Sequence, residues 1–384
     1  MADSEFKLVL DAVRRLVRND VMPREQEIED TDAIPDDLRR KAADMGLFGF
    51  AIPEAYGGLG LNMRQEAELV MELGYTTPAF RSMFGTNNGI AGQVLLVDGS
   101  DEQKQRYLPG MAAGDITASF ALTEDEAGSD PSTLTTTASK DGDSWVINGS
   151  KRFITNAPIA DLFMVFARTG AQDSGAAGIS VFVVDAKTPG IKVGPPDHKM
   201  GQLGAQTAEV FFQDVRVPAD AIVGTEGKGF RTAMASLAHG RLSIAALCVG
   251  LAERLVDEMV TYAANRRQSG RAIGEFQLVT AMLADSQTEM YAGRAMVLDA
   301  ADRFDSGEDQ RMLPSCAKLF CSEMVGRVAD RAVQVHGGAG YIREVPVERF
   351  YRDARLFRIY EGTSQIQQLI IARQVLGDAA KWAT

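Results

Sequence analysis

The hydrophobic pattern of this 384-residue chain changes its period twice, and this change limits the possible folds more than any other feature. Up to about residue 117, apolar residues recur at the three- and four-residue spacing of amphipathic helices. From Ser119 to Val217 the period is close to two, and turn residues recur about every ten positions. Beyond Gly229 the helical period returns in longer segments. We therefore predict an α+β fold, with an N-terminal α-helical domain (1–117), a middle β-barrel or sandwich domain (118–225) and a C-terminal four-helix-bundle domain (226–384).

The same patterns predict individual elements. Asn148-Gly149, between two strand-like runs, is typical of a β-hairpin turn. Long helices are expected over residues 230–265, 277–304 and 313–336. A last helix is expected to begin near Ser364, where Ser364 and Gln367 have the spacing of a capping box.

Charge and cysteine content narrow the possible functions. The formal net charge of −12 argues against a nucleic-acid-binding surface. Cys248, Cys316 and Cys321 lie in apolar, helix-like segments without metal-ligand spacing, so we expect buried thiols in a reducing compartment and no metal site. The N-terminus is too charged for a signal peptide, and no apolar run approaches the roughly twenty residues that span a bilayer. We expect a cytoplasmic protein that does not insert into a membrane.

Two segments in the β-like region carry residue types that suit ligand binding. In Ala121–Asp130, Thr123, Gly128 and Ser129 could offer hydroxyl and backbone donors to a phosphate or a ring edge, although any turn uses such residues. In the second segment, Phe153 stands two residues before Thr155 on chain with an alternating pattern. The ring could pack on a flat cofactor while the hydroxyl bonds to its edge, or Phe153 could be an ordinary core residue.

Two further segments lie in the C-terminal helical region. Gln334 can donate and accept hydrogen bonds, and Gly337 and Gly338 permit a close approach of the backbone to a bulky group. His336 lies between them and is open to a catalytic or a purely structural interpretation. A basic cluster at 266–271, beginning with Arg266, could clamp a pyrophosphate or could be a solvated helix end.

The last candidate segment precedes the final helix. Tyr360, Glu361 and Gly362 stand just before its expected start. A carboxylate there lies beside a helix N-terminus, and Gly362 allows the backbone to turn closely around a ligand. The alternative is that Glu361 only complements the helix dipole.

Together and in this order, these five segments resemble the acyl-CoA dehydrogenase family, and the resemblance covers nearly the whole chain. The N-terminal signature is matched by Thr123-Glu124 and Gly128-Ser129-Asp130, although Thr133 stands where a smaller residue is usual. Tyr360-Glu361-Gly362-Thr363 matches the segment on which medium- and short-chain members carry their catalytic base. The C-terminal signature is matched at Gln334, Gly337, Gly338, Gly340, Tyr341, Glu344, Arg349 and Asp353.

The resemblance implies a reaction. The family oxidises a saturated acyl-CoA thioester to the trans-2-enoyl thioester: a base takes the α-proton while the β-hydrogen leaves as hydride to flavin N5. Glu361 would be that base, and its N–H, with a ribityl hydroxyl of FAD, would stabilise the enolate oxygen. Burial by the substrate should raise the pKa of Glu361. Some branches place the base directly before an arginine on the long helix, but Gly240 stands there, before Arg241.

The resemblance also implies FAD as cofactor, acyl-CoA as substrate and an electron-transferring flavoprotein as acceptor. Arg266, Gln334 and Gly338 would reach across from a neighbouring subunit, which implies a homotetramer or at least a dimer. Ser269 stands where the family usually has an aromatic residue. The residues expected to bind FAD are Phe120, Leu122, Thr123, Gly128, Ser129, Phe153, Thr155, Arg266, Gln334, Gly337, Gly338, Thr363 and Gln365.

The substrate stays open at this point. Ser129, Arg241, Tyr360 and Gly362 match positions on the substrate side, and a short- or medium-chain monocarboxylic acyl-CoA is the leading interpretation. Arg81 matches the segment where glutaryl-CoA dehydrogenase reads a distal carboxylate; that enzyme's nearby serine is replaced by Gly85, and Arg81 could instead face solvent. A glutaryl-CoA-like dehydrogenase, an acyl-CoA oxidase and a silent flavin- or acyl-CoA-binding protein are the alternatives.

Overall fold

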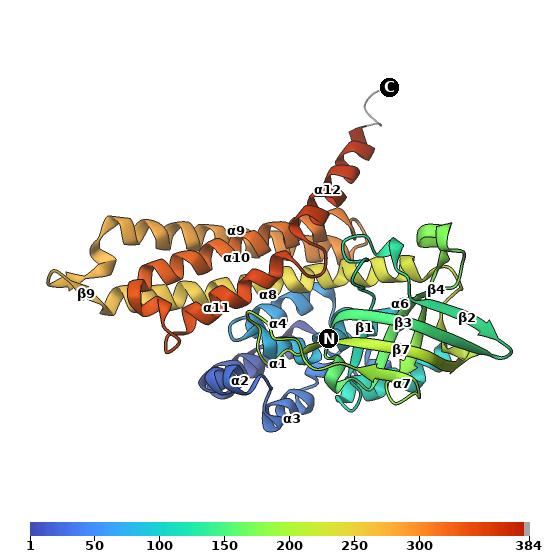
Figure 1. Cartoon of the computed structure of the whole chain (residues 1–384). Coiled ribbons are helices and arrows are strands. Elements are labelled where there is room, and N and C mark those ends of the chain that lie inside the picture. Colours follow the sequence, from blue (N-terminus) through green and yellow to red (C-terminus); the bar gives the residue numbers. More distant parts are fainter. Residues whose placement is uncertain (380–384) are drawn as a thin grey trace.

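The computed structural model describes residues 1–379 and confirms the predicted order of helices, then a sheet, then longer helices (Figure 1). Short helices occupy the first part of the chain and pack beside both the sheet and the later bundle. These helices are α1 (Asp3–Leu16), α2 (Glu25–Thr31), α3 (Asp36–Asp44), α4 (Met63–Gly74), α5 (Pro78–Gly89), α6 (Ala91–Asp98) and α7 (Asp101–Ala113).

The middle of the chain forms one connected sheet with the strand order β6-β7-β3-β2-β4-β5-β8. Most neighbours are antiparallel, as the alternating sequence predicts, but β1 pairs with β4 in parallel, outside this path. The strands are β1 (Ala118–Ala121), β2 (Thr137–Asp141), β3 (Ser144–Thr155), β4 (Leu162–Arg168), β5 (Ile179–Asp185), β6 (Ile191–Val193), β7 (Thr207–Pro218) and β8 (Ile222–Val223).

The hairpin predicted at Asn148-Gly149 is wrong. Both residues lie inside β3, where the register against β7 shifts between Ile147 and Gly149. The turn between β2 and β3 lies earlier, between Asp141 and Ser144. Gly149 has φ 146°, and an added Cβ would lie 2.5 Å from the Oγ1 atom of Thr136. The glycine therefore permits an irregular strand and a close neighbour instead of a turn.

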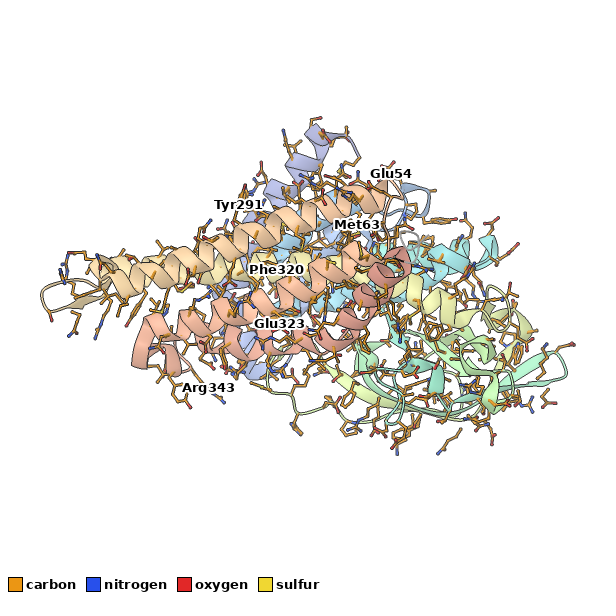
Figure 2. The ribbon with its side chains drawn as sticks, turned by 90° about the horizontal axis from the view of Figure 1, so that it is seen from above. Glu54, Met63, Tyr291, Phe320, Glu323 and Arg343 are labelled. Atoms are coloured by element: carbon orange, nitrogen blue, oxygen red, sulfur yellow. The ribbon has the colours of Figure 1, made fainter. Side chains whose placement is uncertain are left out.

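The C-terminal region is built around α8, a helix of 37 residues. The helices α9 and α10 run side by side, as Figure 2 shows with Tyr291 on α9 and Phe320 on α10. The remaining elements are α8 (Gly229–Asn265), a small hairpin of β9 (Arg267–Gln268) and β10 (Arg271–Ala272), α9 (Gln277–Asp305), α10 (Met312–His336), α11 (Pro346–Arg355) and α12 (Ser364–Ala379).

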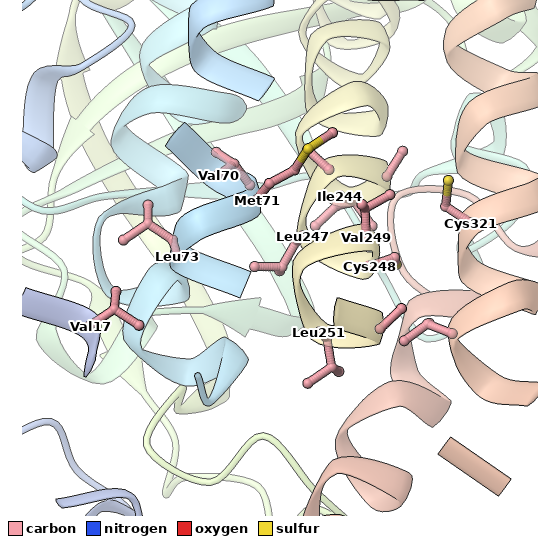
Figure 3. Packing of buried hydrophobic residues seen from close by; sticks show 14 of the residues in the cluster. Val17, Val70, Met71, Leu73, Ile244, Leu247, Cys248, Val249, Leu251 and Cys321 are labelled. Atoms are coloured by element: carbon pink, nitrogen blue, oxygen red, sulfur yellow. The ribbon is translucent and has the colours of Figure 1, made fainter. Parts of the chain in front are cut away.

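One hydrophobic core joins the N-terminal helices to the bundle. Leu73 on α4, Leu247 on α8 and Cys321 on α10 all belong to it (Figure 3). The helices α4 and α8 approach closely because Gly74 and Gly250 face each other, and a Cβ on Gly250 would lie 2.0 Å from the carbonyl oxygen of a residue on α4. This contact fixes α8 relative to the first part of the chain.

The helix α8 is apolar because it is the centre of this core. Its length and composition are also those of a membrane-crossing helix, but 78% of its most apolar stretch is buried inside the protein. The hydrophobic effect within the fold accounts for its sequence.

Candidate active site

The loop before α12 places Glu361 by an unusual backbone conformation. Glu361 has φ 53° and Gly362 has φ 91°, so two successive residues occupy the left-handed region. This region is uncommon for a residue other than glycine and costs about 1 kcal/mol or more, which the surrounding contacts must offset. Such strain is concentrated at functional sites.

The carboxylate of Glu361 lies against α8 at Gly240. A Cβ added to Gly240 would be 2.1 Å from the Oε2 atom of Glu361, which is far inside van der Waals contact. Any larger residue at position 240 would therefore displace this carboxylate. The sequence identified Gly240 only as a missing base; the structure gives it the further role of making room for Glu361.

The carboxylate of Glu361 is shielded from solvent without being neutralised by a partner. Its Oε2 atom is buried and has no hydrogen-bond partner among the described residues. Burial raises the pKa of Glu361, and the positive charges of Arg81, Lys318, Arg241 and His239, in that order, oppose this rise. The arrangement makes the carboxylate more basic than an exposed one, while the surrounding cations limit the rise of its pKa.

Arg81 lies inside the protein and not in solvent, so the solvent-facing interpretation is wrong. It is 5% exposed, on α5, and its Nη2 atom donates a hydrogen bond to the Ser243 hydroxyl. Its Nε atom has no described partner. Gly85, the residue that departs from the glutaryl-CoA pattern, leaves space for the guanidinium group, since an added Cβ would lie 2.6 Å from its Nη1 atom.

Two buried side chains hold the carbonyl groups of the loop. The Nε2 atom of Gln367 donates to the carbonyl oxygens of Glu361 at 3.1 Å and of Gly362 at 3.0 Å. The Nζ atom of Lys318 donates to the carbonyl oxygen of Gly362 at 2.7 Å. The described hydrogen bonds leave the Glu361 N–H unused. Lys318 was not predicted because nothing in the sequence brings α10 to this loop, and Gln367 was expected only as a capping residue.

The predicted capping box of α12 is also wrong. The hydroxyl of Thr363 accepts from the N–H of Ile366 at 3.2 Å and so caps the helix one residue earlier than expected. The Ser364 hydroxyl instead donates to Glu323 on α10 at 2.6 Å. Gln367 makes no capping-box hydrogen bond: its Nε2 atom donates to the loop carbonyls, and its Oε1 atom has no described partner.

The expected cofactor residues of the sheet form a ledge on β1, on the two residues that follow it and on β3. The two strands are tied where the Ser119 hydroxyl donates to the carbonyl oxygen of Thr155 at 2.8 Å and the Arg152 N–H donates to that of Thr123 at 2.9 Å. Phe153 is 60% exposed and has φ 57°, beside a register shift in β3. The ledge, as defined here, consists of Phe120, Leu122, Thr123, Phe153 and Thr155.

The ledge fits a flat, partly apolar group. A large aromatic ring exposed by a strained backbone is costly unless something covers it, and hydroxyl groups stand beside it. Gly128 and Ser129 lie exposed on the turn that follows β1, and an added Cβ on Gly128 would meet no neighbour within 4 Å. A ligand can therefore approach the backbone there.

A buried ion pair lies behind this ledge. The Nζ atom of Lys151 lies 2.7 Å from Glu124 and 3.1 Å from the carbonyl oxygen of Leu122. Glu124 also accepts from the N–H groups of Thr135 at 2.6 Å and Thr136 at 3.0 Å. Although burial would raise the pKa of Glu124, Lys151 and these hydrogen bonds lower it to about 2. The sequence did not predict this pair.

Four expected cofactor residues lie at the far end of the bundle, with β9 (Figure 1). Arg266 ends α8 there, and the exposed residues Gln334, Gly337 and Gly338 end α10 beside it. The distance from Gly240 to Arg266 along α8 is about 40 Å at 1.5 Å per residue. Within one chain these residues do not join the ledge or Glu361.

His336, at the same end, has a structural environment. It is buried, its Nδ1 atom lies 2.8 Å from the carbonyl oxygen of Ala332, and its ring stacks on Tyr262 with centroids 4.2 Å apart. These contacts join α10 to α8. They leave no reason to assign His336 a catalytic role.

The remaining expected residues surround Glu361 more closely. Arg241 is buried, and its Nε atom has no described partner. The Tyr360 hydroxyl is likewise buried without one, and its ring packs 5.9 Å from Phe357. Thr363 is half-buried, whereas Gln365 is exposed on α12.

A second glutamate near this site was not predicted. The Nε2 atom of His239, which precedes Gly240 on α8, lies 2.9 Å from Glu66 on α4. Burial lowers the pKa of His239, but Glu66, a hydrogen bond to the backbone of Gly89 and the charge of Glu361 together raise it. In the sequence, only the position of His239 next to Gly240 pointed to a role near this site, and a single histidine is weak evidence for a functional residue.

Sequence models of three parts of one family match this chain. They are the acyl-CoA dehydrogenase N-terminal domain over residues 3–115, the middle domain over 119–215 and the C-terminal domain over 227–376.

Individual relatives match over nearly their whole length. Acyl-CoA dehydrogenase of Bacillus subtilis is 40% identical over 365 residues, which cover 95% of this chain and 96% of the relative. The caffeyl-CoA reductase-Etf complex subunit CarC of Acetobacterium woodii is 38% identical over 370 residues, which cover 96% and 97%. The solved structure of butyryl-CoA dehydrogenase from Megasphaera elsdenii has a TM-score of 0.94 and 33% identity, and the match covers 98% and 99%.

Proposed function

Because this chain belongs to the acyl-CoA dehydrogenase family of FAD-dependent oxidoreductases, we propose that Glu361 is the base that takes the α-proton of an acyl-CoA thioester. The observation that carries this proposal is the carboxylate itself: strained into position, buried at Oε2 and without a partner there. Burial raises its pKa, which makes it a stronger base. Gly240 supplies the space it needs.

Proton removal also requires stabilisation of the enolate oxygen, because a carboxylate is too weak a base for an unassisted α-proton. The N–H of Glu361 is proposed as one donor to that oxygen. It is available because the neighbouring carbonyls of Glu361 and Gly362 are held by Gln367 and Lys318, while the N–H has no partner among the described residues. One residue would thus provide both the base and an oxyanion donor.

FAD is the family's cofactor, and the ledge on β1 and β3 fits it. We propose that Phe120, Leu122, Thr123, Phe153 and Thr155 hold the ring system, with Gly128 and Ser129 on the adjoining turn. Thr363 and Gln365 are proposed for the phosphate and adenosine side. When bound, FAD supplies the acceptor for the hydride that leaves the β-carbon. This chain's own part is to orient the thioester, exclude water and hold the proton on Glu361.

Arg81 supports a second candidate, a substrate with a distal carboxylate. A guanidinium group that is 5% exposed, with an unpartnered Nε atom, is costly in an apolar pocket unless an anion balances it. No described carboxylate forms an ion pair with Arg81, although Glu361 is close enough for Arg81 to lower its pKa. A dicarboxylyl-CoA, such as glutaryl-CoA, would supply the missing charge.

We also propose an electron acceptor and an oligomeric assembly for this protein. The name of the Acetobacterium woodii relative places it in a complex with Etf, which supports an electron-transferring flavoprotein as the acceptor. The exposed residues Arg266, Gln334, Gly337 and Gly338 lie about 40 Å along the bundle from Glu361. This position supports their contacting FAD held by a second copy, in a dimer or a homotetramer.

The test is anaerobic reduction of the bound flavin by a panel of saturated acyl-CoAs. Butyryl-CoA, octanoyl-CoA and glutaryl-CoA are mixed separately with the purified FAD enzyme, and the visible absorbance is followed. Fast bleaching by one of them is the expected result. A yellow protein that binds acyl-CoA but is bleached by none of them would contradict the proposed reaction.

Arg81→Met separates the two substrate candidates. If a distal carboxylate meets Arg81, this variant should lose at least about tenfold in the rate of flavin reduction by glutaryl-CoA, with a much smaller loss for butyryl-CoA. If Arg81→Met reduced its flavin as fast as the wild type with either substrate, Arg81 would not bind a distal carboxylate. A monocarboxylic acyl-CoA would then be the proposed substrate. Ser243→Ala, which removes the partner of Arg81 but keeps its charge, is the matched control.

A further inference from the structure

Lys318 is a buried cation close to the proposed base. It lies on α10 with 0% of its surface exposed. A buried ammonium group is normally balanced by a carboxylate, but no described carboxylate forms an ion pair with Lys318. Its one described hydrogen bond goes to the carbonyl oxygen of Gly362, 2.7 Å away. No motif in the sequence singles it out.

The charged groups around Lys318 and Glu361 come from several elements. Arg81 on α5, and His239 and Arg241 on α8, act on Glu361 from two sides, and Lys318 acts from α10. Lys318 itself faces Cys248 and Arg241 on α8, Glu323 on its own helix, and Glu361. Burial lowers the pKa of Lys318 to about 8, while Cys248 and Glu361 oppose that change. The ammonium form therefore predominates at neutral pH.

We infer that Lys318 is a positioning residue for the proposed base. Its hydrogen bond to Gly362 holds the left-handed turn that presents Glu361, and its buried charge lies behind that carboxylate without touching it. This inference rests on the proposed function of Glu361. An uncharged donor could make the same hydrogen bond to the Gly362 carbonyl. The proposed effect of the positive charge on Glu361 explains why a lysine is buried there instead.

The separation of the Lys318 ammonium group from the Glu361 carboxylate affects how strong a base Glu361 is. A direct ion pair would satisfy Glu361 and make it a weaker base, as Lys151 does for Glu124. A cation that binds the carbonyl of the next residue lowers the pKa of Glu361 less than a direct partner would, and it leaves the carboxylate oxygens free for the α-proton. Loss of the charge should raise the pKa of Glu361, so that reduction would need a higher pH.

The test compares the pH dependence of anaerobic flavin reduction in four proteins: the wild type, Lys318→Met, Lys318→Gln and Lys318→Arg. The probe is butyryl-CoA or the panel member that reduces the wild type fastest. In the Met and Gln variants, the acidic limb of the rate profile should move up by about one pH unit. The Met variant should also lose about 10- to 100-fold in rate because the loop is released. In Lys318→Arg, which keeps the positive charge, the acidic limb of the pH–rate profile should lie close to that of the wild type.

Two further measurements make the outcome decisive. Amide hydrogen exchange of residues 359–363 should be faster in Lys318→Met, which tests the hydrogen bond without any substrate. Ser364→Ala loosens the same segment by removing its hydrogen bond to Glu323 but changes no charge, so it should leave the pH profile in place.

An unchanged rate profile and unchanged exchange in Lys318→Met would overturn the inference. Should that variant fail to fold, the Gln and Arg variants give the same comparison. Glu361→Gln is measured alongside. If it fails to reduce flavin while the Lys318 variants behave like the wild type, only the inference is wrong. If Glu361→Gln reduces flavin normally, the proposed function is wrong.

Discussion

Glu124 and Glu361 each lie near a buried lysine, Lys151 and Lys318, but the two carboxylates differ in the contacts that they make. Glu124 touches Lys151 at 2.7 Å and accepts two backbone N–H groups, so all its charge is balanced locally. Glu361 has a buried Oε2 atom without a partner, and Lys318 binds the carbonyl of the next residue instead. The pKa of Glu124 falls to about 2, whereas that of Glu361 is raised.

This difference separates a carboxylate suited to a structural role from one suited to the proposed role of a base. Burial acts on both, but the direct contacts of Glu124 stabilise its charge so fully that it cannot serve as a base near neutral pH. The pKa of Glu361 remains raised by burial because the nearby cations do not form direct ion pairs with its carboxylate. Composition and burial alone would treat the two residues alike; their partners decide what each can do.

The largest expected effect is on the reaction. Glu361→Gln removes the base but keeps the size of the side chain and the backbone N–H, so FAD content and unfolding temperature should stay near those of the wild type. The rate of anaerobic flavin reduction should fall by about a thousandfold or more. Stopped-flow absorbance measures the rate, and the FAD absorbance of the purified protein is the control.

Glu124→Gln should affect stability instead. It leaves Lys151 buried without its counter-charge, which should cost about 3 kcal/mol of unfolding free energy. The rate of reduction per bound flavin should remain within a few-fold of the wild type. Urea unfolding at neutral pH measures the loss, and a variant as stable as the wild type would contradict the structural role of the pair.

The same pair predicts a pH dependence. Because the folded state lowers the pKa of Glu124 from 4.5 to about 2, its contribution is present above pH 4.5 and is lost as the pH falls toward 2. The wild type should lose about 3 kcal/mol through this group alone. Glu124→Gln should lack this component, so the two unfolding curves should converge in acid.

A smaller effect is expected from Gly240→Ala. Its Cβ would displace the carboxylate of Glu361, so the rate of flavin reduction should fall by about 10- to 100-fold with little change in stability. Gly250→Ala on the same helix is the matched control. Its Cβ would press on the backbone of α4, so stability should fall by about 1–3 kcal/mol while the rate per bound flavin is kept.

The smallest effect is expected at an exposed lysine–glutamate pair on the sheet domain. Lys140 and Glu226 lie 2.8 Å apart, with 65% and 44% of their side chains exposed. Glu226→Gln should change the unfolding free energy by less than about 1 kcal/mol and leave the rate unchanged. A loss as large as that of Glu124→Gln would mean that burial is not what distinguishes these pairs.

The sequence predicted the order of the domains because hydrophobic period is a local property. It identified Glu361 because the residue stands in a short, contiguous motif before a helix. It misplaced Asn148-Gly149 because the same dipeptide suits a turn or a bulge, and only the neighbouring Thr136 decides between them. The capping box failed because Thr363 caps the helix and the Gln367 amide is turned with its Nε2 atom toward the loop carbonyls.

Contacts between distant segments could not be predicted. Lys318 lies 44 positions from Gly362, and Lys151 lies 27 from Glu124, so neither pair has a local signal. Arg81 was open to a solvent-facing interpretation, and only the packing of α5 against Ser243 shows that it is buried. Tertiary structure decides these cases because it determines which polar atoms lose their water.

The most direct test of the comparison measures proton removal by itself. The FAD enzyme is incubated in D₂O with a 3-thia-acyl-CoA, whose sulfur replaces the β-carbon so that no hydride can leave, and deuterium at the α-carbon is measured by mass spectrometry. The wild type and Glu124→Gln should exchange this proton, and Glu361→Gln should not exceed the rate without enzyme. Exchange by Glu361→Gln at the wild-type rate would contradict the account.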